Sequence, residues 1–130
     1  MNDFLDRVNE EINTTIAIDF DGVIHKSSKG VYDGSIYDGV VEDTKDALEY
    51  LSRKYKLVIF SCRSRPDRPI VNGKNGTESI WEWLKENNLD EYISDVTSIK
   101  PRAKYYIDDK GIRFENWVDI LEFIWEDEDR

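Results

Sequence analysis

Cysteine, histidine and long apolar runs are scarce in this sequence. The single cysteine, Cys62, excludes a disulfide bond within the chain, which fits a reducing cytoplasm. No apolar stretch approaches the roughly 20 residues that a membrane-spanning helix needs, and none has the pattern of a secretory signal peptide. We therefore expect a cytoplasmic protein that does not enter a membrane.

Positive charge is also scarce, because 18 Lys and Arg residues stand against 28 Asp and Glu residues, for a formal net charge of −10. This balance excludes a broad electrostatic surface for nucleic acids or anionic membranes, which requires a basic footprint. A local basic patch remains compatible with it. With 130 residues and 39% hydrophobic side chains, the chain predicts one globular domain over residues 1–130, built around a single core.

The stretch from Thr15 to Ile24 organises the chain. Its apolar, β-branched residues predict a buried parallel strand that ends in two carboxylates, Asp19 and Asp21, and a turn at Gly22. In open α/β folds, ligands bind at this carboxyl end of the strands. The two carboxylates repel each other unless a cation or a proton lies between them, which indicates a functional site. The alternative is an acidic turn after a strand, in which Gly22 serves the turn alone.

Helices and strands alternate along the rest of the chain. After a lead-in helix within residues 1–13, expected to pack on the domain, the pattern predicts helices at 41–55, 77–88 and 117–125, strands at 56–61, 95–99 and 105–107, and a solvated acidic tail at 126–130. Thr77 and Asn116 are predicted to cap the last two helices. This order is typical of βα units, which build an α/β fold with a mainly parallel sheet. Ser61 and the pair Asp108-Asp109 should therefore meet Asp19 and Asp21 at one edge.

Two loops flank the predicted edge. Residues 25–40 contain three glycines and alternating apolar residues, which predicts a short β-hairpin flap over the strand end, and we interpret His25 as a solvated loop residue. The loop at 62–76 carries Arg63, Arg65 and Arg68, which indicates recognition of an anion in this acidic chain. The alternative is a solvated loop that balances nearby acids.

The side chains expected at this edge suit phosphoryl transfer. Magnesium prefers oxygen ligands and is commonly held by one or two carboxylates together with substrate phosphate. A carboxylate can also attack phosphorus, while a second carboxyl group transfers protons to the leaving oxygen and from water. A cation and hydrogen-bond donors stabilise the charge on the transferring phosphoryl oxygens.

Four short motifs follow one another in a fixed order. They are Asp19-Phe20-Asp21-Gly22, Ser61 at the end of an apolar strand, Lys100, and Ile107-Asp108-Asp109. This order resembles the haloacid dehalogenase superfamily of phosphohydrolases over about residues 15 to 125. The resemblance implies a three-layer α/β/α Rossmann-like sandwich. Members of this superfamily usually carry a cap domain either after the first motif or between the second and third motifs. Neither of these two gaps holds one here, so the chain is similar to small capless members, including the phosphatase half of polynucleotide kinase-phosphatases.

By this resemblance, each motif has a role. Asp19 is the nucleophile and Asp21 the general acid/base. Magnesium is held by Asp19, the backbone carbonyl of Asp21, and Asp108 and Asp109, with the direct ligand of that last pair left open. The substrate-binding set comprises Ser61, Arg63, Arg65, Arg68 and Lys100, of which Ser61 and Lys100 also serve catalysis. Lys104 is an alternative to Lys100, but it falls inside the predicted strand.

The implied activity is magnesium-dependent hydrolysis of phosphomonoesters through an aspartyl-phosphate intermediate. An open, capless site implies a phosphorylated small molecule, a nucleotide or a nucleic-acid end as substrate, or a lid borrowed from an oligomeric partner. One alternative is a non-catalytic module that binds magnesium and phosphate. Another is a receiver domain, but there the Lys-Pro pair comes last, whereas here Lys100-Pro101 precedes the acidic pair. The presence of both Asp19 and Asp21 favours hydrolysis.

Overall fold

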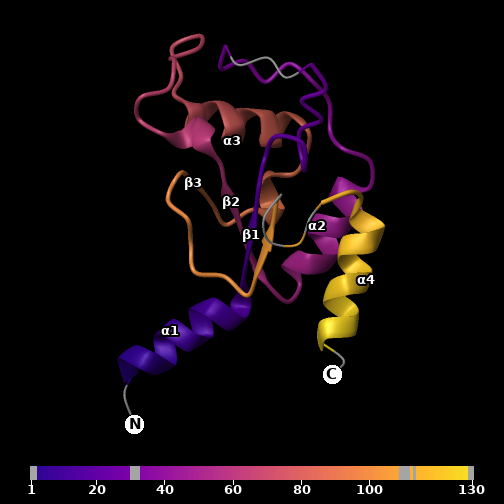
Figure 1. Ribbon diagram of the computed structural model, residues 1–130. Coiled ribbons are helices and arrows are strands. Elements are labelled where there is room, and N and C mark those ends of the chain that lie inside the picture. The colour runs from indigo at the N-terminus through magenta and orange to yellow at the C-terminus, as the bar shows by residue number, and fades with distance from the viewer. Residues whose placement is uncertain (1–2, 30–32, 109–111, 113, 129–130) are drawn as a thin grey trace.

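A computed structural model of the chain describes residues 3–29, 33–108, 112 and 114–128, and it has a mixed α/β fold (Figure 1). The elements in chain order are α1 (Asp3–Thr14), β1 (Thr15–Ile18), α2 (Thr44–Ser52), β2 (Lys56–Phe60), the 3-10 turn η1 (Cys62–Ser64), α3 (Gly76–Glu86), the 3-10 turn η2 (Asp90–Tyr92), β3 (Asp95–Thr97), β4 (Tyr105–Ile107) and α4 (Trp117–Glu128). Within the described residues, no helix has both the length and the apolar character needed to cross a membrane.

The four strands form one parallel sheet in the order β3-β2-β1-β4. The first strand in the chain is thus a central one, with Ile18 aligned to Ile59 of β2 and to Ile107 of β4. Its four residues are all buried, as a continuous apolar run flanked on both sides predicts. The predicted parallel sheet is confirmed, and all its carboxyl ends lie at one edge.

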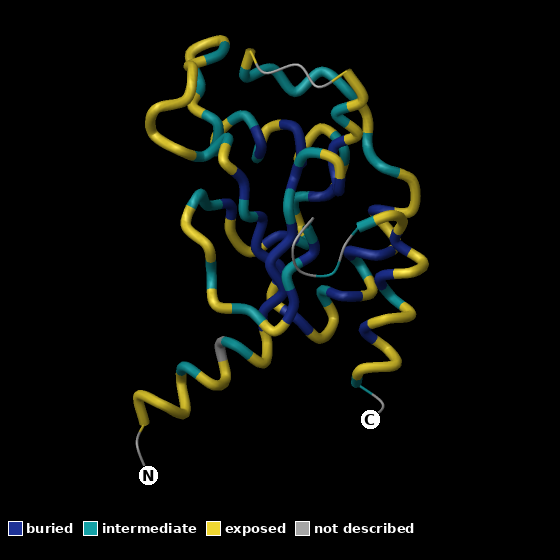
Figure 2. Tube along the Cα trace, in the orientation of Figure 1, coloured by how far each residue is buried: buried dark blue, intermediate teal, exposed yellow. Residues whose placement is uncertain are grey.

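One face of the sheet carries the main core. Because successive side chains of a strand point to opposite faces, Ile16, Ile18 and their register partners share one face. These residues form one cluster with buried side chains of three helices, such as Leu48 of α2, Leu84 of α3 and Ile120 of α4. Figure 2 shows this buried centre in dark blue, surrounded by exposed helix faces and loops.

The opposite face is covered differently. Ala17 and Val58 are buried there but lie outside the main cluster, and residues 98–104 cross this face to connect β3 to β4. The Tyr106 hydroxyl donates to the carbonyl of Pro101 at 2.5 Å, which holds the crossing segment against β4. A crossover between parallel strands usually contains a helix, whereas this one, orange in Figure 1, contains none.

The lead-in helix does not pack as expected. Figure 1 shows α1 projecting away from the other elements, and it runs into β1 with no loop between them. Phe4 and Leu5 are 58% and 54% exposed, and only Val8 and Ile12 of the apolar stripe are partly covered. A helix that continues directly into a strand has no turn with which to fold back on the sheet.

Two further expectations about the helices are wrong. The N-cap of α3 is Asn75, not Thr77, because Asn75 and Glu78 form a reciprocal capping box. The residues at 126–128 complete α4 in place of a fraying tail: Glu126 and Asp127 are exposed, as predicted, but Glu128 accepts hydrogen bonds from Lys54 and Lys104, each at 2.6 Å, and residues 129–130 lie outside the described chain. The Asn116 cap of α4 is confirmed, since its side-chain oxygen accepts from the backbone N–H of Asp119.

The segment at 25–40 forms a closed loop. The described residues contain an antiparallel bridge between His25 and Val40, and the N–H of Lys26 donates to the carbonyl of Gly39. These contacts close the base of the loop, but the described part of this segment contains no strand. We call residues 33–38 the covering segment, because Arg63 and His25 bind it beside the carboxyl edge of the sheet.

Candidate functional site

Backbone register places the first carboxylates at the edge. The N–H of Asp19 donates to the carbonyl of Ile107 at 3.1 Å, so the ladder between β1 and β4 continues one residue past the strands. Asp108 follows Ile107 directly, and continuing the printed register by one residue places its backbone beside that of Asp19. The fold therefore brings Asp19 and Asp108 together from opposite ends of the sequence.

Ser61 joins the same edge from the other neighbouring strand. Its N–H donates to the carbonyl of Thr97 at 2.9 Å, and its side chain is buried. The Ser61 hydroxyl oxygen accepts from the N–H of Arg63 at 3.2 Å, which caps the short turn η1. This cap fixes the direction in which the chain leaves β2, so Arg63 turns back toward β1.

A tight turn presents Asp21. The carbonyl of Phe20 accepts from the N–H groups of Ile24 and His25, and Gly22 has φ +82°, a conformation that glycine adopts without strain. Phe20 is fully buried in the core, so it anchors the start of the turn. The predicted turn at Gly22 is confirmed, and the Asp21 side chain projects beside Arg63.

Two side chains, Arg63 and His25, hold the Asp21 carboxylate. Arg63 binds it with two nitrogens, Nε to Oδ2 at 2.7 Å and Nη2 to Oδ1 at 3.0 Å, and His25 Nδ1 lies 2.9 Å from Oδ1. Burial raises the pKa of this carboxyl, but the hydrogen bonds from His25 and Arg63, together with the charge of Arg63, outweigh burial and hold the pKa below 3.8. Asp21 is therefore ionised in this arrangement.

The basic loop divides into two parts. Arg63 and Arg68 line a cavity of about 100 Å³ that also includes Asp21, Pro69 and Val71. Arg65 is not among its lining residues: it is mainly exposed, with Nε 3.5 Å from an oxygen of Asp67. The structure thus brings two of the three predicted arginines to the edge and leaves Arg65 on the surface.

The start of α3 packs closely against this loop. A Cβ atom built on Gly76 would lie 1.6 Å from the carbonyl oxygen of Arg63, so only glycine fits there. This close approach of the first residue of α3 fixes the position of the Arg63 backbone. The capping box of Asn75 and Glu78 fixes the same helix end.

The two candidate lysines, Lys100 and Lys104, have different partners near β4. Lys100 Nζ lies 4.7 Å from the centre of the Tyr106 ring, on the face of the sheet that carries the Ala17 and Tyr106 side chains. Asp108 is two residues beyond Tyr106, which is about 7 Å along a strand and within reach of a lysine side chain. Lys104 instead pairs with Glu128 at 2.6 Å, at the amino end of β4.

His25 is the residue that sequence reasoning missed. The interpretation of a solvated loop side chain is wrong, because His25 is 0% exposed and contacts Asp21. The contact with Asp21 could have been predicted from the sequence, because the two residues are four apart across a glycine turn. The burial of His25 could not, since the rings that cover it include Trp83 of α3.

Of the predicted magnesium ligands, the structure describes Asp19, Asp21 and Asp108. Asp109 lies outside the described residues, and in the part that is described no group of three or more His, Cys, Asp and Glu side chains is close enough to hold a metal ion. The available donors at the edge, the carboxylates of Asp19 and Asp108 and nearby backbone carbonyls, are all oxygens, which suits a hard cation such as Mg²⁺.

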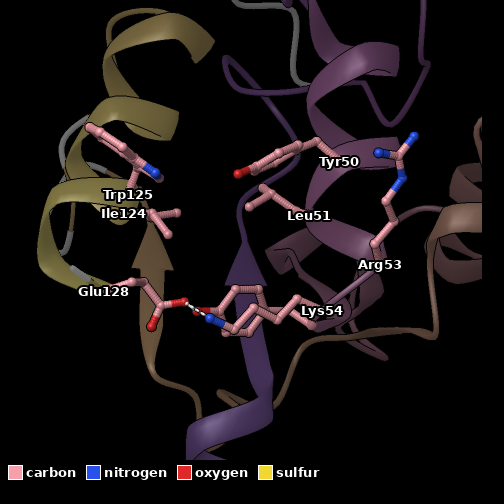
Figure 3. Close-up of a pocket in the computed structure, with 8 residues that line it drawn as sticks. Tyr50, Leu51, Arg53, Lys54, Ile124, Trp125 and Glu128 are labelled. Atoms are coloured by element: carbon pink, nitrogen blue, oxygen red, sulfur yellow. Dashed lines mark hydrogen bonds and ion pairs between the residues drawn. The ribbon is translucent and has the colours of Figure 1, made fainter.

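A larger cavity lies elsewhere, between α2 and α4. It has a volume of about 250 Å³ and is lined by Tyr50, Leu51, Arg53, Lys54, Tyr55, Ile124, Trp125 and Glu128. Figure 3 shows Trp125 and Ile124 of α4 on one side of it and Tyr50 and Leu51 of α2 on the other. None of the motif residues lines it, and the Glu128 carboxylate already binds Lys54 and Lys104. The acidic edge is therefore the better candidate site.

Comparison with known proteins gives no relative: no family model, curated protein or solved structure matches the chain. The family resemblance therefore depends on the four motifs alone.

Proposed function

We propose that the chain is a magnesium-dependent phosphomonoester hydrolase of the haloacid dehalogenase type, with an open site at the carboxyl edge of the sheet. The observation that carries this proposal is the meeting of Asp19, Ser61 and Asp108 at the ends of three neighbouring strands, with Asp21 two residues from Asp19. This arrangement supports the roles that the motif order implies for Asp19, Asp21, Ser61 and Asp108.

In the proposed reaction, an oxygen of Asp19 attacks phosphorus, and the bond to the ester oxygen breaks. Asp21 gives its proton to that leaving oxygen. Water then attacks the aspartyl-phosphate, the bond between Asp19 and phosphorus breaks, and the Asp21 carboxylate takes the proton of the water. Asp19, Asp108, Asp109 and the backbone carbonyl of Asp21 would hold Mg²⁺, which would stabilise the charge on the phosphoryl oxygens.

The remaining donors bind and orient the phosphoryl group. Ser61 donates its hydroxyl hydrogen to a phosphoryl oxygen, and Lys100 moves from the Tyr106 ring toward Asp19. Arg63 and Arg68 offer charged donors beside Asp21, and Arg65 contributes from the surface to a longer anionic substrate. A phosphate that competes for Arg63 weakens its hold on Asp21, raises the pKa of that carboxyl, and so favours the protonated acid that the first step needs.

The same proposal includes a flap over the site and a three-layer arrangement of the fold. Residues 25–40 act as a flap, and the crossing segment at 98–104 occupies the place of the outer layer in a three-layer sandwich. The described part of the chain contains no cap domain over the site, so nucleotides, nucleic-acid ends and small phosphorylated molecules can all enter, and an oligomeric partner can supply a lid. A reducing cytoplasm suits the single cysteine, Cys62.

Phosphate release tests this function. The protein is assayed with and without Mg²⁺ on sugar phosphates, mononucleotides and oligonucleotides phosphorylated at the 3′ or 5′ end, with Asp19→Asn as control. We expect metal-dependent release from one substrate class and none from Asp19→Asn. If the folded protein binds Mg²⁺ yet releases phosphate from no substrate, it is a binding module and the proposal is wrong.

A further inference from the structure

His25 lies in a closed aromatic cage. Its ring stacks on Phe20 with centroids 5.5 Å apart, and it meets Tyr37 and Trp83 edge-to-face at 5.4 and 5.6 Å. The side chain is 0% exposed, so water does not reach either ring nitrogen. A buried imidazole needs a protein partner for each nitrogen.

Both nitrogens have one, and the partners define the tautomer. Nε2 accepts from the backbone N–H of Asp38 at 3.0 Å, and a backbone N–H can only donate. Nε2 is therefore unprotonated, so Nδ1 carries the hydrogen and donates it to Asp21 Oδ1 at 2.9 Å. The imidazole thus forms a directed link from the backbone of Asp38 to the carboxylate of Asp21.

The covering segment at 33–38 is bound at both ends by the partners of Asp21. His25 holds its last residue, Asp38, and Arg63 Nη1 donates to the carbonyls of Gly34 and Ser35, each at 3.1 Å. The indole of Trp83 adds a bond to the Asp38 carbonyl at 3.2 Å. Every side chain that the structure shows on Asp21 therefore also holds this segment.

We propose that His25 is a positioning residue that couples the covering segment to Asp21. When the segment lies over the edge, the Asp38 N–H fixes the imidazole, and the imidazole fixes one oxygen of Asp21. When the segment lifts, the imidazole loses its acceptor bond and Asp21 loses a defined orientation. The charged groups that face the imidazole are Asp21, Asp38 and, across Asp21, Arg63. The catalytic consequence depends on the proposed function, but the coupling itself does not.

The tautomer is tested on the unchanged protein. The ¹⁵N shifts and two-bond ¹H–¹⁵N correlations of the single histidine at neutral pH report which ring nitrogen carries hydrogen. We expect a neutral ring with hydrogen on Nδ1. A ring with hydrogen on Nε2, or with hydrogen on both nitrogens, would overturn the proposal.

Two conservative variants separate the two bonds. In His25→Asn the amide takes the place of Nδ1 and can donate to Asp21, whereas in His25→Gln the amide oxygen takes the place of Nε2 and can accept from Asp38. We expect hydrogen exchange of the Asp38 amide to accelerate about tenfold or more in His25→Asn and to stay near the original rate in His25→Gln. Equal exchange rates in both variants would contradict the coupling.

Kinetics then connects the link to catalysis. We expect His25→Gln to lower kcat about tenfold or more with little change in KM, and His25→Asn to keep more of kcat while KM rises. Equal losses of kcat in both folded variants would show a structural role alone. If the protein releases no phosphate, the proposed function fails, while the tautomer and exchange measurements still decide the coupling.

Discussion

The two halves of the acidic edge are built by different means. Asp21 is fixed by side chains, with two nitrogens of Arg63 and one of His25 on its oxygens. Asp19 and Asp108 are brought together by backbone register, through the bond from Asp19 N–H to the Ile107 carbonyl. Replacing one of the side chains that bind Asp21 should change the orientation of its carboxylate. Replacing the side chain of Asp19 or Asp108 should leave the backbone register unchanged and remove only the chemical group.

The largest expected effect is in the half held by register. Asp19→Asn keeps the side-chain oxygen that accepts from the N–H of Phe20 at 2.7 Å, so the fold should not change. It removes the proposed nucleophile, and turnover should fall at least about 10³-fold. Steady-state kinetics and circular dichroism check both points.

A matched control exists on β3. The side-chain oxygen of Asp95 accepts from the next N–H, that of Val96, at 2.9 Å, in the same local arrangement but at an exposed position. Asp95→Asn should leave turnover unchanged. If Asp19→Asn retained comparable activity, Asp19 would not be the nucleophile.

The half held by side chains should respond in both activity and stability. Arg63→Lys replaces a bidentate pair by a single contact and releases the covering segment, so kcat/KM should fall about 10²-fold and the free energy of unfolding by about 1–3 kcal/mol. Urea denaturation measures the second effect. Arg53→Lys is the control, because its exposed contact with Glu49 at 3.5 Å should contribute less than about 0.5 kcal/mol. Equal losses in the two variants would argue against a special role for Arg63.

A smaller effect should separate the remaining arginines. Arg68 lines the cavity beside Asp21, whereas Arg65 lies on the surface near Asp67. Replacing both with alanine should weaken substrate binding more than chemistry, and most of the rise in KM, roughly several-fold, should come from Arg68→Ala. A change confined to kcat, or a larger effect of Arg65→Ala, would show that the cavity is not where the substrate anion binds.

The smallest effect concerns the acid range. The hydroxyl of Ser28, followed by the N–H groups of Gly39 and Ser28, holds the pKa of Asp38 at about 2. Because this pKa is below its ordinary value of 3.8, the stabilising contribution is complete above pH 3.8 and is lost as the pH falls toward 2. Amide shifts of Ser28 and Gly39 should change in this range, and Asp38→Asn should abolish the change. A midpoint near the ordinary value would contradict these bonds.

The sequence predicted the half built by register better than the half built by side chains. The strand at Tyr105–Ile107 was predicted at its observed bounds, because its aromatic and β-branched residues and the acidic pair behind it are local signals. The capping box of Asn75 and Glu78 was equally local, yet Thr77 was chosen because it stands next to the apolar stripe. This error moves the start of α3 by two residues and leaves the sheet unaffected.

The bonds on Asp21 could not be predicted in the same way. Arg63 follows a different strand, and no periodic pattern specifies which carboxylate its guanidinium binds. The burial of His25 depends on Phe20 and on Trp83 in α3, which meet only once the sheet has formed. The partners of Glu128 and Asp127 are Lys54 and Tyr105, which are distant in sequence, so no local pattern predicts these contacts.

The position of β1 also bears on how the protein is made. Of the four strands of the sheet, the one that comes first along the chain is a central one: Thr15 pairs with Lys56, and Ile16 with Tyr105 much later in the chain. Two long loops must close before these pairings become favourable, which makes for slow folding. On the ribosome, β1 has one open side until β4 emerges. A nascent chain that has not yet reached Asp108 therefore exposes an unpaired strand edge and lacks one side of the proposed site.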